Sequence, residues 1–448
     1  MILKKWWRKK FVRVISYVVS ILLFIVIATL TTVDLTPKEK CAYYTETIKR
    51  LDTFQFSSFS IDRLAVGWSK KSITPNVPTD MAGYRPRGLN TEVHDSLFVR
   101  AMVFGEGVKN VAILSFDLIL VHPNIVQAID KLIEEQNIPI DFIYYSSTHT
   151  HNSFGNWSSE LAGRHVMGSY EEEIVSFLAK NAIEAIKEGI RVKRKATISY
   201  AEVPLKKFVY NRLRQDGRVD TLMRVIKVAH SDEIAYLSTF AAHATSLPRK
   251  STYLSADYPG ELCNRLENQE GVGFAMYCAG AVGSHAPVLP SFTFEAIDLY
   301  TRKMTDTIIR SNQLFRIQKL TSIDYGTFTM DLRSPQLRIT KGIRLRPWLF
   351  TSVMGDNKAE IKVLKLGGVV LVGTPCDFSG EYYHPINQLI DDPSKRVMIS
   401  SFNGNYIGYI TRDDLYDEHH HEVQQMNWYG PYNGAYFTEV IAKLVSKL

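Results

Sequence analysis

Two histidines separated by one residue follow an apolar run in the first half of the chain. The apolar residues 142–145 lead into the tetrad Thr148-His149-Thr150-His151. Residues two apart on an extended strand point to the same face, so we expect both imidazoles to aim at one spot. Paired neutral imidazoles on a rigid strand end suit zinc or a similar transition metal. The tetrad alone is equally compatible with two hydrogen-bonded loop histidines.

Other predicted strands further along the chain also end in groups that could bind a metal. The apolar stretch 234–240 runs into His243, and the stretch 369–373 runs into Asp377. Both residues have ordinary interpretations, His243 as a core histidine and Asp377 as the N-cap of the following helix. Asp377 is also placed to supply a carboxylate oxygen to a zinc site.

Two further stretches have compositions that suggest contact with a ligand. The polar run 412–422 contains three successive histidines, but successive side chains diverge, so at most one or two of them serve a single ion. The stretch 277–287 is rich in small residues, which allow a ligand to approach the backbone closely.

The positive charge of the chain is concentrated at its N-terminus. The 448 residues carry a net charge of +7, and their 45% hydrophobic content is ordinary for a folded protein. Six cations lie within the first 13 residues, so the remainder of the chain is nearly neutral. A nearly neutral body argues against a nucleic-acid-binding surface. The six cations are Lys4, Lys5, Arg8, Lys9, Lys10 and Arg13.

An uncharged apolar run, residues 14–33, follows these cations. A helix of about 20 residues spans the hydrocarbon core of a membrane. The cations favour the cytoplasmic side for residues 1–13, which places everything after residue 33 outside the cytoplasm. A cleaved signal peptide is the alternative, but residues 28–32 offer no good cleavage site. We interpret the run as a single-pass signal anchor in the cell membrane.

The remainder of the chain is predicted to form a single large catalytic domain, residues 61–448, on a polar stalk of residues 34–60. Strand-like and helix-like stretches alternate, which is typical of an α/β fold with a mixed sheet covered by helices on both faces. Such sheets usually carry their sites at strand C-termini. The predicted strands are 111–116, 142–145, 195–202, 222–229, 235–241, 273–278, 360–366 and 369–373. The predicted helices are 123–136, 170–188, 257–268, 293–311, 378–391 and 433–447.

Taken in order, these segments resemble the catalytic N-terminal domain of the neutral (non-lysosomal) ceramidase family. The resemblance runs from about Val66 to the Gly430-Pro431 turn, which is most of the chain outside the anchor and stalk. Each motif is of moderate specificity, but their ordered combination is specific. Besides the tetrad, the matching stretches are 73–75, 81–84, 211–212, 254–257 and 372–375.

The resemblance implies one catalytic zinc ion in a deep pocket and cleavage of the amide between a fatty acyl group and sphingosine. It implies His149 and His243 as zinc ligands. Asp377 falls where the family has a ligating glutamate, and Tyr409 falls on its ligating tyrosine. His151 is then expected beside the metal, facing the substrate.

The resemblance also implies residues that contact the substrate rather than the metal. Arg212 matches the substrate-contacting arginine of the family, and Asp257 joins the expected catalytic set. His421 falls where the family has a second active-site tyrosine.

Three features of this sequence differ from the family pattern. The family loop reads Asp-Val-Ser-Pro and contains a catalytically required serine, whereas Ala286 occupies that position here, with Ser284 and His285 nearby. Asp377 is one methylene shorter than glutamate, so the ion or the backbone must shift to keep a bond of about 2.0–2.2 Å. No C-terminal immunoglobulin-like domain is expected after residue 431.

The sequence therefore predicts a membrane-anchored, zinc-dependent hydrolase that cleaves an N-acyl amide in a lipid-like substrate by metal-activated water. One alternative is a ceramidase-like protein that binds a lipid or another ligand without turnover, which the alanine at position 286 favours. Another is an esterase that uses the same metal centre. The sequence indicates the membrane and a lipid-like substrate as partners, argues against nucleic acid, and gives no signal from which a protein partner can be inferred.

Overall fold

Three mixed five-stranded sheets form the body of the protein in this computed structural model, which describes residues 2–84 and 86–448, without the side chains of 2–5 and 8. The first sheet has the order β7 (Phe142–Ser147), β6 (Lys109–Phe116), β5 (Phe98–Glu106), β3 (Ala65–Ser72), β8 (Arg194–Lys195). The second has the order β14 (Val272–Ala279), β12 (Ile234–Phe240), β11 (Leu222–Ala229), β9 (Thr197–Pro204), β16 (Arg316–Gln318). The third has the order β2 (Ser57–Ser60), β17 (Ser322–Met330), β19 (Ala359–Leu366), β20 (Val369–Thr374), β22 (Arg396–Ser401).

The three sheets share one buried core because each central strand carries apolar side chains on both of its faces, and one of these faces points toward the other sheets. Val111 and Ile113 of β6 face this shared core, together with Leu237 of β12 and Leu371 of β20. Alternate residues of the same strands, such as Leu114, face the helices instead. Both faces of the central strands are therefore apolar, and burying each such side chain stabilises the fold by about 1.5–3 kcal/mol.

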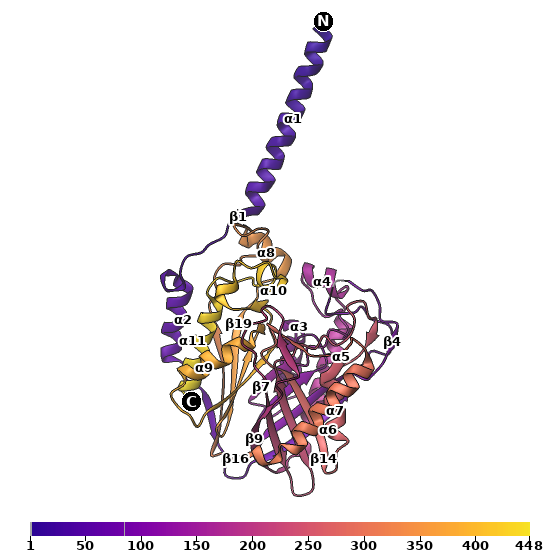
Figure 1. The fold of residues 1–448 in the computed structure, drawn as a ribbon, viewed down its shortest axis with the longest axis vertical. Coiled ribbons are helices and arrows are strands. Elements are labelled where there is room, and N and C mark those ends of the chain that lie inside the picture. Colours follow the sequence, from indigo (N-terminus) through magenta and orange to yellow (C-terminus); the bar gives the residue numbers. More distant parts are fainter. Residues whose placement is uncertain (1, 85) are drawn as a thin grey trace.

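Helices cover the outer face of each sheet (Figure 1). On the first sheet lie α3 (Pro123–Glu135) and α5 (Glu172–Arg191), and α6 (Asp257–Glu267) and α7 (Phe294–Arg310) lie on the second. Around the third sheet lie α2 (Ala42–Thr53), α9 (Tyr383–Leu389) and α11 (Asn433–Ser446). The remaining helices are α1 (Ile2–Thr29), α4 (Leu161–Met167), α8 (Pro347–Met354) and α10 (His421–Gln424).

Each sheet contributes one parallel strand pair, and the carboxyl ends of these pairs meet at one place. The parallel pairs are β6 with β7, β12 with β14, and β20 with β22. Buried serines join the sheets near these ends: Ser115 Oγ donates to the Tyr277 carbonyl at 2.5 Å, and Ser401 Oγ donates to the Gly280 carbonyl at 2.8 Å. Residues that follow these strands are thereby fixed against one another.

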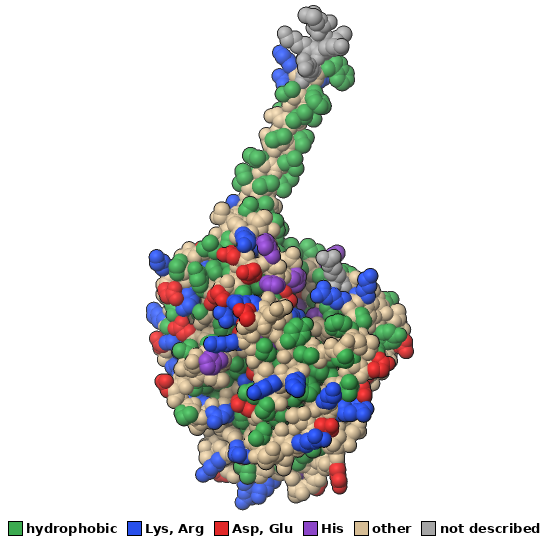
Figure 2. All heavy atoms as spheres, in the orientation of Figure 1, with side chains coloured by type: hydrophobic (Ala, Val, Ile, Leu, Met, Phe, Trp, Pro, Cys, Tyr) green, Lys and Arg blue, Asp and Glu red, His purple; other side chains and the backbone are tan. Residues whose placement is uncertain are grey.

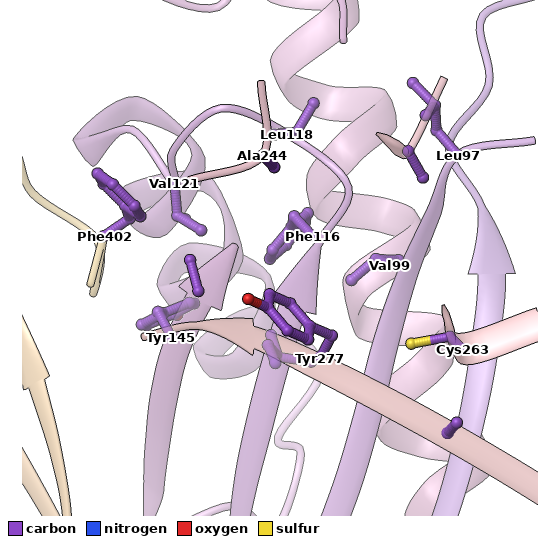
Figure 3. Close-up of a cluster of buried hydrophobic side chains, with 14 of the residues drawn as sticks. Leu97, Val99, Phe116, Leu118, Val121, Tyr145, Ala244, Cys263, Tyr277 and Phe402 are labelled. Carbon is purple, nitrogen blue, oxygen red and sulfur yellow. The ribbon is translucent and has the colours of Figure 1, made fainter. Parts of the chain in front are cut away.

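A close-packed apolar layer lies directly beneath this meeting point (Figure 3). Phe116, Tyr145 and Tyr277 come from strands of two sheets, and Phe402 follows a strand of the third. All four side chains are buried. The floor of the site is therefore built from the same core that holds the sheets together.

Four two-stranded pairs complete the topology. They are β1 (Leu30–Thr32) with β18 (Ile343–Leu345), β10 (Val209–Asn211) with β15 (His285–Pro287), β4 (Glu92–Val93) with β13 (Tyr253–Leu254), and β21 (Asp377–Phe378) with β23 (Tyr409–Ile410). Two of these pairs, β10 with β15 and β21 with β23, carry residues that the sequence analysis selected for the site.

The α/β class, the mixed strand directions and the single domain agree with the sequence-based prediction, although the strands form three principal sheets instead of one. The predicted helix 378–391 is too long, because residues 377–378 form β21 and only Tyr383–Leu389 is α-helical. The stalk prediction for residues 34–60 is wrong. This segment forms α2, which packs on α11, and β2, which adds an edge strand to the third sheet.

An apolar helix projects from the domain at the N-terminal end (Figure 1). Its stretch Lys9–Thr29, 21 residues, is long and apolar enough to cross a membrane and is not buried by the rest of the protein. A signal sequence would have the same properties. Residues 30–32, which the sequence places in the span, form β1 because they pair with β18. Three of the N-terminal cations, Lys4, Lys5 and Arg8, have side chains that lie outside the described part of the structure.

Candidate metal centre

The histidine tetrad lies in a turn that follows β7, and not within the strand itself. β7 ends at Ser147, and His149 has a φ of 60°, in the left-handed region. Strand alternation therefore does not direct the two imidazoles. They nevertheless converge as predicted, because the turn brings His151 back beside His149.

A third imidazole joins them from the second sheet, since His243 follows β12. The Nε2 atoms of His149 and His243 are 2.9 Å apart, and so are those of His151 and His243. The Nε2 atoms of His149 and His151 are 3.3 Å apart. All three side chains are buried, and together they form a cluster of three imidazoles that could hold a metal ion. By these distances, His151 is placed as well as His149 and His243 to bind an ion.

The hydrogen bonds of the outer ring nitrogens fix which atoms face the centre. His149 Nδ1 lies 2.5 Å from the Ile119 carbonyl and His243 Nδ1 lies 3.4 Å from the Val282 carbonyl. A carbonyl only accepts, so both Nδ1 atoms carry hydrogen and the neutral rings present bare Nε2 lone pairs. Two such lone pairs 2.9 Å apart repel each other unless a cation lies between them.

A carboxylate completes the cluster. Asp377 is fully buried, and its Oδ1 lies 3.4 Å from His149 Nε2 and 3.8 Å from His243 Nδ1. Oδ2 accepts a hydrogen bond from the Tyr406 hydroxyl at 2.7 Å, whereas Oδ1 has no hydrogen-bond partner among the described residues. An unpartnered buried carboxylate oxygen is costly in a native fold.

These donors fit a transition metal such as zinc. Nitrogen ligands around tetrahedral zinc at 2.0–2.1 Å are about 3.3–3.4 Å apart, and the observed Nε2 separations are within a few tenths of an ångström of this spacing. The carbonyls that hold Nδ1 of His149 and His243 are the usual outer partners of metal-binding imidazoles. An ion would also satisfy the unpartnered Oδ1 of Asp377.

Burial and neighbouring charge keep the imidazoles in the neutral form that binds metal. Burial, followed by the neighbouring His149 ring and Arg212, lowers the pKa of His151 well below its usual range. Burial and then Arg212 lower the pKa of His243 in the same way. Two aromatic rings hold the imidazoles in place: Phe402 stacks on His149 at 3.9 Å, and Tyr84 contacts His151 at 4.6 Å between ring centroids.

The structure brings Tyr409 and Arg212 to the edge of the cluster. Tyr409 of β23 is the register partner of Asp377 in β21, so both side chains lie side by side. Arg212 Nη2 donates to the Tyr409 hydroxyl at 3.2 Å. Burial raises the pKa of Tyr409 well above its usual range, so its hydroxyl keeps a proton that it can donate. Glu422 Oε1, 3.3 Å from Arg212 Nε, holds the guanidinium in this position.

The other two predicted catalytic residues have different surroundings. Asp257 is buried at the start of α6, and its carboxylate accepts from the Ser246 amide at 2.9 Å and the Tyr258 amide at 2.6 Å. It thereby anchors the loop that carries His243. His421 is exposed and lies 2.6 Å from Gln425 Oε1 through its Nδ1, and the structure does not bring it to the triad.

The loop after β14 wraps around His243 and the segment of Asp377, but its hydroxyl groups are directed elsewhere. Ala286 is buried in β15 opposite Tyr210. His285 Nε2 accepts from the Asp220 amide at 3.1 Å, so its Nδ1 carries the hydrogen and donates to Ser284 Oγ at 2.9 Å. Burial, followed by Arg212, lowers the pKa of His285 to about 3. His285 therefore does not act as a base toward Ser284.

The sequence analysis missed several residues that contact the cluster. Phe402 has a φ of 65° and stacks on His149, but it lies in a polar stretch without a recognisable motif. Tyr406 holds Asp377 and lies three residues before Tyr409, so the aromatic stretch that directed attention to Tyr409 could also have identified it. Tyr84 lies in the stretch 81–84 that matches the family, and Glu422 adjoins the histidine run.

Comparison with known proteins supports the resemblance to neutral ceramidases. The neutral/alkaline non-lysosomal ceramidase, N-terminal family model matches residues 64–282. No curated protein sequence is significantly similar to the chain. The neutral ceramidase from Pseudomonas aeruginosa superposes with a TM-score of 0.72 at 15% identity, over 86% of this chain and 74% of that chain. A ceramidase complexed with C2 gives a TM-score of 0.73 at 14% identity, over 86% and 75%.

At such low identity the structural similarity shows the fold alone. The family model shows the sequence relationship for the residues that it matches. The model covers the region that carries the histidine triad, from the strands of the first sheet to Val282. The superposed structures extend the same fold over most of the remaining domain. Residues 64–282 therefore belong to the neutral/alkaline non-lysosomal ceramidase family, and most of the remaining domain shares the fold of the solved ceramidases.

Proposed function

We propose that this protein is a membrane-anchored, metal-dependent hydrolase that cleaves an N-acyl amide bond in a lipid-like substrate. The main observation is the convergence of three imidazole Nε2 atoms, 2.9–3.3 Å apart, beside the unpartnered oxygen of Asp377. A buried group of this kind without an ion would be destabilising, so its presence favours a metal centre.

We assign the metal to His149, His243 and Asp377, with His151 at an equivalent distance and Tyr409 at the edge. A bound zinc ion lowers the pKa of a coordinated water and polarises the substrate carbonyl. Asp377 would hold the ion through Oδ1, since its other oxygen is already engaged by the Tyr406 hydroxyl.

Arg212 and Tyr409 are suited to stabilise the oxygen that becomes negative during the reaction. The Arg212 guanidinium donates to the Tyr409 hydroxyl, which leaves the Tyr409 proton free to donate to an anionic oxygen. Both side chains are held before substrate arrives, Arg212 by Glu422 and Tyr409 by the pairing of β21 and β23. A preorganised donor of this type contributes about 3–4 kcal/mol to lowering the barrier.

A lipid-like N-acyl substrate is supported by the family relationship and by the apolar N-terminal helix. The name of a similar structure, neutral ceramidase from Pseudomonas aeruginosa, suggests an amide between a fatty acyl group and a long-chain amine. The helix would keep the domain at the membrane, where such lipids are found. The cations at 4–13 favour the cytoplasmic side for the N-terminus and an extracytoplasmic catalytic domain.

Metal analysis of the purified full-length protein tests the proposal, with histidine variants as internal comparisons. We expect one zinc ion per chain, lost together with hydrolysis of N-acyl amides in His149→Ala and His243→Ala. His384 is exposed and distant from the triad in sequence and sheet, so His384→Ala is a matched control that should keep both. The variant His151→Ala separates a ligand, whose loss removes zinc, from a residue that acts on the substrate. A metal-free parent protein with undiminished hydrolysis contradicts the proposal.

The surroundings of Ala286 favour a second candidate, a protein that binds a lipid without cleaving it. Ala286 lacks the hydroxyl expected from the family, and the Ser284 hydroxyl lies 2.6 Å from Ser379 Oγ with His285 donating to it. Neither neighbour is therefore free to replace the missing serine. Zinc-loaded protein that binds N-acyl lipids but hydrolyses neither amides nor simple esters supports this candidate, and hydrolysis of esters alone supports an esterase.

A further inference from the structure

The C-terminal end of α1 is capped by the domain. Arg346 Nε donates to the Ile27 carbonyl at 2.7 Å, and the Arg346 amide donates to the Thr29 carbonyl at 2.8 Å. Trp348 Nε1 donates to the Ala28 carbonyl at 3.1 Å. The last carbonyls of a helix have no partner within the helix. These three bonds therefore fix the helix end to the residues that bind it.

The chain that follows α1 strengthens this attachment. β1 pairs with β18 from Leu30 opposite Leu345 to Thr32 opposite Ile343, and the Val33 amide donates to the Gly342 carbonyl at 3.0 Å. We call residues 343–354, which comprise β18, Arg346 and α8, the collar. The collar lies at the foot of α1 (Figure 1).

The length of α1 sets the depth of the collar. The apolar stretch Lys9–Thr29 has 21 residues and would extend about 30 Å, the thickness of the hydrocarbon core. If this stretch spans a bilayer, Ala28 lies at the edge of the hydrocarbon. Trp348, which is hydrogen-bonded to Ala28, must then lie at the same depth.

The exposed side of the collar has the composition of a membrane interface. Trp348 is 56% exposed and Ile343 is 42% exposed, although both are large and apolar. Thr351 and Ser352 are also exposed and lie three and four residues after Trp348, on the same face of α8. Tryptophan and arginine are favoured where the hydrocarbon meets the head groups.

We propose that the collar is embedded in the head-group layer of the bilayer that α1 spans, so that the domain sits directly on the membrane. This inference rests on the membrane anchoring in the proposed function. The surface is continuous with α1, whose exposed apolar side chains themselves require lipid (Figure 2). The occupant is therefore a lipid surface, and the domain keeps a fixed orientation on it.

This orientation brings the bilayer close to the metal centre. α8 packs against α4, and Arg164 and His165 of α4 line a cavity of about 270 Å³. Arg87 lines the same cavity and donates through Nη2 to the His151 carbonyl at 2.5 Å. A lipid substrate would reach the triad from this side.

Photo-crosslinking of the full-length protein in bilayer nanodiscs of phosphatidylcholine and phosphatidylglycerol tests the proposal. The photoreactive residue p-benzoylphenylalanine is introduced singly at Thr351, whose side chain is not needed for the bonds to α1. A matched probe at Ile317 reports on β16, at the end of the domain opposite α1 (Figure 1). A probe at Leu23 reports on α1 itself.

We expect lipid adducts at Thr351 and Leu23 and none at Ile317. The additional substitution Trp348→Glu should reduce the adduct at Thr351 and leave that at Leu23 unchanged, because a carboxylate at this depth is disfavoured. Adducts at Leu23 alone overturn the collar and leave the anchor intact. Absence of adducts at Leu23 overturns both. Adducts at Ile317 equal to those at Thr351 also overturn the proposal.

Discussion

The substitution Asp377→Asn should stabilise the metal-free protein and weaken the zinc-loaded one. In the protein without metal, Oδ1 of Asp377 faces the bare Nε2 of His149 at 3.4 Å, so two acceptors oppose each other. An asparagine keeps one oxygen for the Tyr406 hydroxyl and turns its amide donor toward His149. The same change removes the negative charge that a zinc site requires.

The sizes of the two effects follow from the contacts. Removing a buried unsatisfied acceptor gains about 1–3 kcal/mol. An unfolding entropy of about 2.1 cal/mol/K per residue over about 400 residues converts each kcal/mol into about 1 °C of melting temperature. Zinc at about 1,000 times its Kd adds about 4.1 kcal/mol to the parent protein, but only about 0.4 kcal/mol to a variant that binds it about 1,000-fold more weakly.

We therefore expect the order of the two melting temperatures to reverse between chelator and added zinc, as measured by differential scanning calorimetry. The Asp377→Asn variant should melt about 1–3 °C above the parent in chelator and below it in zinc. Asp413 provides a matched control, because its carboxylate accepts from the Gly434 amide at 3.0 Å and the Ala435 amide at 2.8 Å. Asp413→Asn should lower the melting temperature in both conditions. A lower melting temperature of Asp377→Asn in chelator would refute a metal role for this carboxylate.

Two further predictions concern the loop after β14 and the acid side of the stability profile. Ala286→Ser should raise kcat for N-acyl amides without changing zinc content if the family serine is what this site lacks, and unchanged kcat in a zinc-loaded variant would contradict that account. The hydrogen bond from His122 lowers the pKa of Glu160 to about 2. This carboxylate therefore stabilises the fold above its unfolded value of about 4.3, and the contribution is lost as the pH falls toward 2. In denaturant titrations, the free energy of unfolding of Glu160→Gln should be lower than that of the parent above pH 5, and the two values should converge in acid. A constant difference at all pH values would exclude the linkage.

Much of the fold was predictable because apolar periodicity and strand ends are visible in the sequence. The predicted strands 111–116 and 142–145 correspond to β6 and β7, and the predicted helix 257–268 corresponds to α6. The number of sheets was not predictable, since strands buried on both faces look alike whichever sheet they join. The role of residues 34–60 was missed because α2 is polar on one side and buries only Thr47 and Leu51.

The site was predictable in its residues more than in its geometry. His149, His243 and Asp377 each follow a predicted strand, and parallel strands bring such positions together. The hydrogen bonds that orient them come from main-chain carbonyls of Ile119 and Val282, which any residue could supply. Sequence therefore gives no signal for the bare lone pairs on which the metal assignment depends.

Backbone strain at His149 explains why strand alternation did not predict the direction of its side chain. The same strain supports a functional role for this residue. His149 and Phe402 both have positive φ values, 60° and 65°, although neither is glycine. Such conformations cost about 1–3 kcal/mol each and persist only where the surroundings enforce them. Here they come from two different sheets and place one ring flat against the other at 3.9 Å. The strain is accounted for by the position that it gives to His149, whose Nε2 lies 2.9 Å from His243 Nε2 and 3.4 Å from Asp377 Oδ1.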